Sequence, residues 1–242
     1  MSGVIQYSFI IPVRVINDYV RESIFWILKN KRNDFEIIIY PDSATLETWP
    51  KTRQIGTGPV GPARKRSLAR RDAEGEVLIF IDDDAYPETN FLAVLDRDFA
   101  DKRVAAIGGP AVTPPHDTYW QKVSGAVFLS KFSGGCPERY IPTGNKKFVA
   151  DWPSVNLSIR KEVFTKLGGF DCNYWPGEDT KLCLDIVKTG GKILSDPELI
   201  VYHHRREGLK RHLRQISGYG LHRGYFAKKF PGLPARAGGL VV

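Results

Sequence analysis

Three adjacent carboxylates are the most concentrated chemistry in the sequence. Asp82, Asp83 and Asp84 directly follow the apolar run Val77 to Ile81, which has the length of a buried strand. Alternate residues of an extended chain point the same way, so Asp82 and Asp84 can converge on one hard cation while Asp83 faces elsewhere. The pattern favours a Mg²⁺ or Mn²⁺ site completed by a substrate's phosphates over a solvated acidic turn, which seldom follows a buried strand directly.

A second acidic pair, Glu178 and Asp179, follows Trp175 and Gly177 and opens an expected helix. Carboxylates in the first turn suit the helix dipole, so a simple helix cap is one interpretation. The other is a general base that takes a proton from an acceptor hydroxyl. Aromatic walls from Trp152 and Trp175 would raise its pKa by desolvation. We therefore assign Trp152, Trp175 and Gly177 to acceptor binding.

Two histidines, His203 and His204, close the apolar run LIVYHH. A histidine at a strand end is commonly structural, but a neutral imidazole is also a metal ligand. With Asp82 and Asp84 already proposed, a third ligand here would complete the protein's share of an octahedral site. We favour His203 over His204 for this role.

The positive charge is concentrated near the end of the chain. The 242 residues carry a net charge of +8, and the segment 205–236 alone accounts for that balance, with nine Lys or Arg against Glu207. Such a segment attracts a phosphorylated ligand, an anionic membrane surface or nucleic acid. No nucleic-acid-binding module is recognisable, so we expect no nucleic-acid partner. Three cysteines, with no signal peptide and no membrane-length apolar run, indicate a cytoplasmic protein.

Apolar runs alternate with amphipathic stretches through the first 110 residues. This alternation predicts an α/β fold with a doubly wound, mostly parallel sheet. We expect strands at 7–13, 35–40, 77–81 and 104–107, and helices at 19–28, 62–72 and 91–99. Residues 110–153 lack steady periodicity and are expected to be irregular and to shape a ligand site. Helices at 161–167 and 179–188 and a strand at 199–202 should follow.

A glycine-rich stretch offers a different function. Gly56, Gly58 and Gly61 match the dinucleotide fingerprint G-x-G-x-x-G, and Asp82 follows about twenty residues later. The segment before them, WPKTRQI, is polar and interrupted by proline, so the buried first strand that this fingerprint requires is missing. A dinucleotide-dependent oxidoreductase is therefore kept only as an alternative, together with a non-catalytic nucleotide-sugar binder or a nucleic-acid binder.

In their order along residues 7–230, these features resemble the family 2 glycosyltransferases with the GT-A fold. The resemblance rests on the strand FIIPVR, the turn Asp42-Ser43, the block GPARKRSLARRDAEGEVLIFIDDDAYPE with its D-x-D motif, and the segments SVNLSIRKEVFTKLGGFD, GEDTKLCLDIVKTGGKI and VYHH. It implies a catalytic domain over 1–206, with a nucleotide-sugar half to about residue 110 and an acceptor half from about 111. A basic helical segment and tail, 207–242, would be appended to it.

The resemblance also implies roles for individual residues. The nucleotide-sugar pocket would comprise Pro12, Val13, Arg14, Asp42, Arg64, Asp82 and Asp83. Asp84, Asp82 and His203 would bind Mn²⁺ or Mg²⁺. Asp179 would be the general base of a single, inverting displacement, and Glu178 would help to orient the acceptor.

Two departures from the family pattern bear on its substrates. Tyr40-Pro41-Asp42-Ser43 replaces the usual acidic turn that recognises the base, although a UDP-sugar remains the expected donor. The Q-x-x-R-W motif of processive synthases is absent after Gln215. The basic tail instead resembles that of non-processive members that work at membranes. We therefore expect a glycan or lipid-linked acceptor at the inner face of a membrane, with residues 205–236 meeting its anionic surface.

Overall fold

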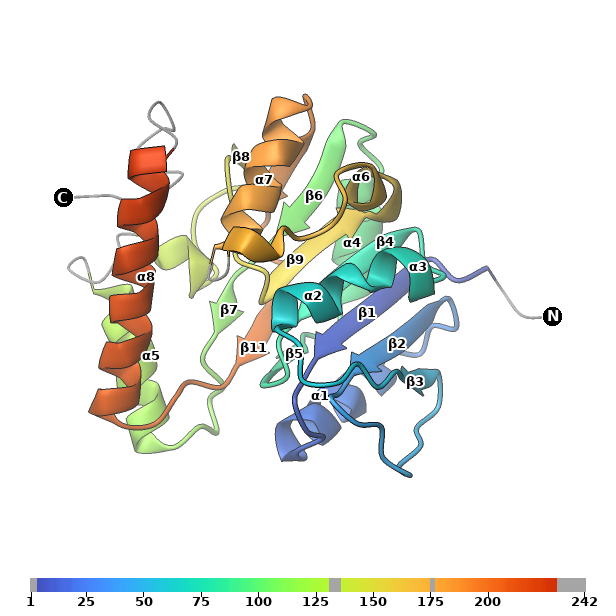
Figure 1. Ribbon diagram of the computed structural model, residues 1–242, viewed down its shortest axis with the longest axis horizontal. Helices are drawn as coiled ribbons and strands as arrows, with labels where there is room; N and C mark the ends of the chain where they lie inside the picture. Colours follow the sequence, from blue (N-terminus) through green and yellow to red (C-terminus); the bar gives the residue numbers. More distant parts are fainter. Residues whose placement is uncertain (1–3, 131–135, 175–176, 230–242) are drawn as a thin grey trace.

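A computed structural model describes residues 4–130, 136–174 and 177–229 (Figure 1). An eight-stranded sheet with the order β3-β2-β1-β4-β9-β6-β10-β8 lies beside a three-stranded sheet with the order β5-β11-β7. The strands are β1 (Tyr7–Pro12), β2 (Phe35–Tyr40), β3 (Thr52–Gln54), β4 (Val77–Ile81), β5 (Ala85–Pro87), β6 (Val104–Gly108), β7 (Ala111–Val112), β8 (Lys147–Val149), β9 (Asn156–Arg160), β10 (Lys192–Ser195) and β11 (Val201–His203). The predicted α/β class with a large, mostly parallel sheet is confirmed.

Helices cover both faces of the larger sheet. On one face α1 (Asp18–Leu28) and α4 (Phe91–Phe99) pack against the sheet in one apolar cluster. On the other face lie α2 (Pro62–Ser67), α3 (Ala69–Asp72), α6 (Lys161–Lys166) and α7 (Glu178–Lys188), which share a second cluster. Because both faces are covered, β1, β2 and β4 are buried at every residue, which explains their continuous apolar runs.

Strand β9 is the main feature that the sequence did not predict. It lies between β4 and β6, antiparallel to both. Its polar residues Asn156 and Ser158 are fully buried, which hides the apolar run that marks the other central strands. The Asn156 amide donates hydrogen bonds to the carbonyl oxygens of Leu199, at 2.7 Å, and Pro110, at 3.3 Å. The amide N–H groups of the buried Asn156 are thus satisfied by backbone from two neighbouring segments, whereas its Oδ1 accepts no hydrogen bond from the described residues.

Two expectations about helices need correction. The helix predicted at 62–72 is two short helices, α2 and α3, that meet at Leu68. The region 110–153, predicted to be irregular, contains α5 (Tyr119–Leu129). Thr118 and Gln121 form a capping box at its start, a T-x-x-Q signal that was present in the sequence. The last strand of the sheet region begins at Val201, two residues later than expected.

The chain then continues into α8 (Leu209–Lys229), which Figure 1 shows in red and away from the large sheet. Its Phe226 is buried, and the ring centroids of Phe226 and Tyr174 are 5.7 Å apart. The helix therefore packs against the short 3₁₀ turn η2 (Cys172–Tyr174) that precedes α7. Among the described residues, no helix combines the length and the apolar character needed to cross a bilayer.

Candidate functional site

Strand pairing brings the first acidic motif and His203 together. Asp82 to Asp84 leave the C-terminal end of β4, and β5 begins immediately afterwards at Ala85. Strand β11 runs antiparallel to β5, with His203 opposite Ala85. Residues separated by about 120 positions in the chain thus meet at the carboxyl edge of the sheet, the edge at which open α/β folds bind ligands.

The three predicted metal ligands form one cluster. Single ligand atoms of Asp82, Asp84 and His203 all lie within 4.8 Å of one another. The His203 Nε2 is 3.1 Å from Asp84 Oδ1. Burial alone would raise the pKa of Asp84, but the charge of His203 and the hydrogen bond from its ring outweigh burial and lower it. Two carboxylates and an imidazole are a donor set that fits a divalent cation such as Mn²⁺.

Asp83 faces away from this cluster, as the alternation along the chain predicts. Its Oδ2 accepts a hydrogen bond of 3.3 Å from the side chain of Asn17, which also caps α1. Burial, and then the charges of Asp84 and Asp82, raise the pKa of Asp83 to about 6. Asp83 therefore links the acidic motif to α1.

The second acidic pair divides into a buried and an accessible carboxylate. Gly177 has a φ of 118°, a left-handed conformation that suits glycine, and the chain turns there into α7. Glu178 is buried, and burial, followed by the charge of Asp179, raises its pKa to about 7. Asp179 is partly exposed, and its two oxygens accept hydrogen bonds from the backbone N–H groups of Ser154, at 3.2 Å, and Thr180, at 2.8 Å. Asp179 is thus the carboxylate of the pair that a ligand can reach.

Arg66 connects the two acidic motifs. Its guanidinium donates one hydrogen bond to Asp82 and another, of 3.2 Å, to Glu178. Only 5% of Arg66 is exposed, and its pair with the buried Glu178 is shielded from water, whereas Asp82 is partly exposed. Arg66 was not predicted, although the run Arg64-Lys65-Arg66 on a short helix indicates that at least one basic side chain faces the site.

The neighbouring basic residues also differ from expectation. Arg64, the predicted nucleotide contact, is exposed, whereas Lys65 is buried. The Lys65 ammonium donates hydrogen bonds to Asp42 and to the carbonyl oxygen of Val13, the latter at 2.6 Å. The cation beside the predicted nucleotide pocket is therefore Lys65, because the helix turns Arg64 outward.

The remaining nucleotide-side residues lie together where β1 and β2 end. The Val13 N–H donates to the carbonyl oxygen of Tyr40 at 3.1 Å, and the Asp42 N–H donates to that of Arg14 at 3.0 Å. Pro12 and Val13 are buried, Asp42 is partly exposed and Arg14 is exposed. This arrangement places the Asp42 carboxylate and the Arg14 side chain at the same sheet edge as Asp82.

The burial of Trp152 argues against its assignment to the acceptor. Trp152 is 2% exposed, and its indole N–H donates a 2.9 Å hydrogen bond to the carbonyl oxygen of Gly109. A Cβ on Gly108 would lie 2.1 Å from the ring, so the ring is packed directly on the end of β6. An indole enclosed in this way has no free face for an acceptor sugar. Trp175 lies outside the described residues.

Two polar residues near Asp179 were not predicted. The buried Asp151 pairs with the Arg139 guanidinium at 2.5 Å and accepts a 3.4 Å hydrogen bond from the Thr180 hydroxyl. Burial is the largest influence on the Asp151 carboxyl and raises its pKa. The Arg139 guanidinium opposes this rise, and the charge of Asp179 adds to it. No sequence pattern indicated this pair, because Arg139 and Asp151 both lie in the region predicted to be irregular.

The glycine-rich stretch does not have the setting of a dinucleotide site. The strand before it, β3, has three residues and lies at the edge of the sheet, parallel to β2. Gly58 has a φ of 70°, and its N–H donates to the carbonyl oxygen of Asp42 at 2.9 Å. These glycines therefore form the loop that leads past Asp42 into α2.

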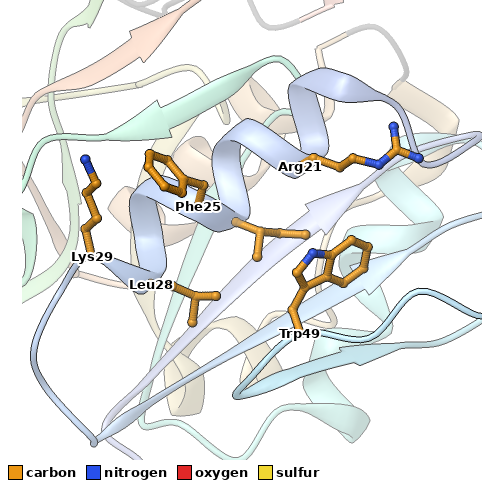
Figure 2. A pocket seen from close by; sticks show the side chains of 6 residues that line it. Arg21, Phe25, Leu28, Lys29 and Trp49 are labelled. Carbon is orange, nitrogen blue, oxygen red and sulfur yellow. The ribbon is translucent and has the colours of Figure 1, made fainter.

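An apolar hollow of about 380 Å³ lies away from these residues, on the outer side of α1. Figure 2 shows Trp49 beside α1, and the α1 residues that line the hollow include Phe25 and Leu28. No residue of either acidic motif lines it. The hollow therefore contributes nothing to the chemistry of the sheet edge.

Solved structures of glycosyltransferases share this fold. The mannosyltransferase PcManGT from Pyrobaculum calidifontis, in complex with GDP-Man and Mn²⁺, aligns with a TM-score of 0.67 and 20% identity over 95% of this chain and 65% of that one. Residues 1–349 of S. aureus TarS, in complex with UDP-GlcNAc, align with a TM-score of 0.62 and 16% identity over 92% of this chain and 67% of that one.

Curated proteins show the same likeness in sequence. The pre-mycofactocin glycosyltransferase of Mycobacterium tuberculosis is 25% identical over 160 residues, which cover 66% of this chain and 33% of that protein. The O-antigen biosynthesis protein RfbC of Myxococcus xanthus is 26% identical over 232 residues, which cover 84% of this chain and 18% of that protein. The chain thus spans a third or less of the length of these two relatives.

The sequence model of the family described as "Glycosyl transferase family 2" matches residues 8–167. That match extends from β1 to the end of α6 and includes the first acidic motif with Arg66. The match covers well over half of the chain, and together with the shared fold it shows that this chain belongs to glycosyl transferase family 2.

Proposed function

We propose that this protein transfers a sugar from a nucleotide-sugar donor to a hydroxyl group of an acceptor, with inversion at the anomeric carbon. The observation that carries the proposal is the convergence of Asp82, Asp84 and His203 at one sheet edge, with Arg66 linking them to the segment that bears Asp179. A dinucleotide-dependent oxidoreductase is set aside, because family membership and the edge position of β3 both oppose it.

The residues divide the work of the reaction between two sides of the site. A divalent cation held by Asp82, Asp84 and His203 would neutralise the charge that develops on the departing nucleoside diphosphate. On the acceptor side, Asp179 takes the proton of the attacking hydroxyl. Its backbone hydrogen bonds from Ser154 and Thr180 hold the carboxylate in place before the acceptor arrives.

Glu178 has a supporting role in this scheme. It is buried, it is paired with Arg66, and its pKa is raised to about 7 by burial and then by Asp179. Its second oxygen accepts the N–H of Gly177 at 3.0 Å, which holds the turn into α7. Glu178 therefore positions Asp179, and it takes no proton from the acceptor.

We propose a UDP-sugar as the donor. Asp42 is the group that would accept a hydrogen bond from the ring N–H of uracil, with Lys65 fixing the carboxylate through its ion pair. Two structural neighbours, GalNAc-T7 and TarS, hold UDP or a UDP-sugar, whereas PcManGT holds GDP-Man. Asp42→Asn, in which the amide oxygen can still accept, should bind UDP better than Asp42→Ala.

A panel of nucleotide sugars tests the proposed reaction. The protein is incubated with UDP-, GDP-, CDP- and dTDP-sugars and Mn²⁺, and the release of nucleoside diphosphate is measured with glycan and lipid-linked acceptors. We expect Mn²⁺-dependent release with a UDP-sugar. A panel that yields no transfer, hydrolysis or binding with any donor would overturn the proposal.

We also propose that the acceptor side lies against an anionic membrane surface. Tyr119 and Trp120 of α5 are 72% and 62% exposed, and Leu221 of α8 is 79% exposed. Exposed Lys228 and Lys229 follow on the same helix. Large exposed apolar side chains, and cations on one of the same helices, suit the headgroup region of a membrane.

Vesicle sedimentation tests this surface. Binding to phosphatidylserine-containing vesicles should exceed binding to phosphatidylcholine vesicles, and Trp120→Ala with Leu221→Ala should weaken it. Leu46→Ala is the matched control, because Leu46 is fully exposed in a loop that follows β2. Equal binding by both variants, or equal binding to both kinds of vesicle, would refute the proposal.

A further inference from the structure

A second group of metal-ligating side chains lies close to the first but faces a different part of the molecule. Glu22 of α1, His116 from the segment between β7 and α5, and His204 after β11 place single ligand atoms within 4.8 Å of one another. From the sequence, His203 is favoured over its neighbour His204 as a metal ligand. The structure gives each of these adjacent histidines a separate carboxylate partner.

Two distances between ligand atoms in this group are similar to those around a tetrahedral metal ion. His204 Nε2 is 3.0 Å from one oxygen of Glu22, and His116 Nε2 is 3.4 Å from the other. Zinc–nitrogen and zinc–oxygen bonds of about 2.0–2.1 Å at tetrahedral angles would separate neighbouring ligand atoms by about 3.3 Å. Both imidazoles present Nε2 to the carboxylate, each to a different oxygen, so a small shift of the Glu22 side chain would let one oxygen and the two nitrogens bind one ion.

Asp117 supplies the outer support that metal-bound histidines generally have. The Nδ1 of the buried His204 hydrogen-bonds to Asp117 Oδ1, which fixes the ring and leaves Nε2 directed at Glu22. The other oxygen, Asp117 Oδ2, is buried and accepts no hydrogen bond from the described residues. With neutral histidines the group carries two negative charges, which a divalent cation would balance.

We propose that Glu22, His116 and His204 bind a Zn²⁺ ion, with Asp117 as the positioning residue. Two imidazoles and one carboxylate suit zinc, whereas Mg²⁺ prefers oxygen ligands throughout. The site ties α1 and the segment before α5 to the end of β11. Because the His204 N–H donates to the carbonyl oxygen of Asp84 at 3.0 Å, it also braces the chain that carries the first cluster.

The alternative is a metal-free ion-pair network, in which a protonated His204 bridges Asp117 and Glu22. Zinc titration distinguishes the two. A background variant with Asp84→Asn and His203→Asn removes two ligands of the first cluster and leaves the second intact. After treatment with a chelator, we expect this variant to bind one equivalent of Zn²⁺ by calorimetry and none of Mg²⁺.

Substitutions in that background locate the ion. His116→Ala should remove the bound equivalent, and because His116 is exposed the fold should be kept, as circular dichroism in the presence of chelator checks. Glu22→Gln should also remove it, whereas the matched control Glu47→Gln, at the neighbouring ion pair with Arg21, should retain it. Asp117→Asn should weaken zinc binding about 10–100-fold.

Co²⁺ provides an independent readout. When it replaces zinc, its visible absorption should show a four-coordinate ion with histidine ligands, and His116→Ala should abolish that spectrum. The proposal is overturned if the background variant binds no zinc, or if the His116→Ala variant binds zinc with unchanged stoichiometry and affinity. None of these measurements depends on sugar transfer.

Discussion

The two acidic motifs of the site contain the same kind of residue but are held in different ways. In the first, Asp84 lies beside His203, whose charge and hydrogen bond overcome the effect of burial and lower the carboxyl pKa. In the second, burial and then Asp179 raise the pKa of Glu178 to about 7. Arg66 contacts both motifs. The difference indicates that partners and burial, more than residue type, set the carboxyl pKa values of the two motifs.

The largest expected effect comes from the accessible carboxylate of the second motif. Asp179→Asn keeps the side-chain shape but removes the proton acceptor, so the rate of transfer should fall by about 10²–10⁴-fold. Donor binding belongs to the first motif and should change little. Turnover and donor affinity, measured separately by product release and calorimetry, check this. An unchanged turnover rate would refute Asp179 as the base.

Removing the Arg66 side chain, which contacts both acidic motifs, tests their connection. Arg66→Ala leaves buried Glu178 without its charged partner, and breaking such a pair costs about 3–5 kcal/mol of unfolding free energy. Chemical denaturation measures this cost. Arg64→Ala is the matched control on the same helix, where an exposed position should cost less than about 0.5 kcal/mol. Equal costs at the two positions would contradict the assigned role of Arg66.

Trp152 tests whether the segment before β9 supports the second motif from the core. Trp152→Ala removes a side chain that is 2% exposed and should cost about 3–5 kcal/mol. The exposed Trp120 of α5 provides the control, since Trp120→Ala should leave the unfolding free energy nearly unchanged. If Trp152→Ala weakened acceptor binding without loss of stability, its assignment to the core would be wrong.

The raised pKa of Glu178 predicts a smaller, pH-dependent effect. A carboxyl with a pKa of 4.5 when unfolded and about 7 when folded is favoured by folding in its protonated form. Its contribution is therefore present below about pH 4.5 and is lost as the pH rises to about 7, a change on the order of 3 kcal/mol.

The difference in unfolding free energy between the wild type and Glu178→Gln isolates the pH-dependent contribution of Glu178. The wild type should lose stability relative to the variant across that pH window. Asp83 has a raised pKa as well, but its effect is present in both proteins and cancels in the difference. A pH-independent difference would contradict the raised pKa of Glu178.

The sequence predicted best where burial is uniform. Strands β2 and β4 have the predicted bounds because their apolar runs are continuous, and helix α4 has them because its apolar residues recur with the helical period. Strand β9 escaped prediction because the polar Asn156 and Ser158 interrupt its apolar pattern although both are fully buried, and Asn156 is held there by hydrogen bonds to backbone of distant segments. Local pattern cannot show such contacts.

The candidate site was also predictable only in part. Asp82, Asp84 and His203 were predicted from strand-end position and family resemblance, and the pairing of β5 with β11 brings them together. Arg66 was missed because the choice among three consecutive basic residues depends on the direction of a short helix. The burial of Trp152 was not predicted because an aromatic residue next to a site has the same sequence signature whether it lines the site or packs beneath it.

Mn²⁺-dependent binding of UDP is the most direct test of the central claim, that the first motif and His203 hold a donor through a divalent cation. Calorimetry would compare the wild type, Asp84→Asn and Asp179→Asn, each with and without Mn²⁺. The wild type and Asp179→Asn should bind UDP only when Mn²⁺ is present, and Asp84→Asn should lose most of that binding. UDP binding by Asp84→Asn that equals the wild type in its Mn²⁺ dependence would contradict the claim.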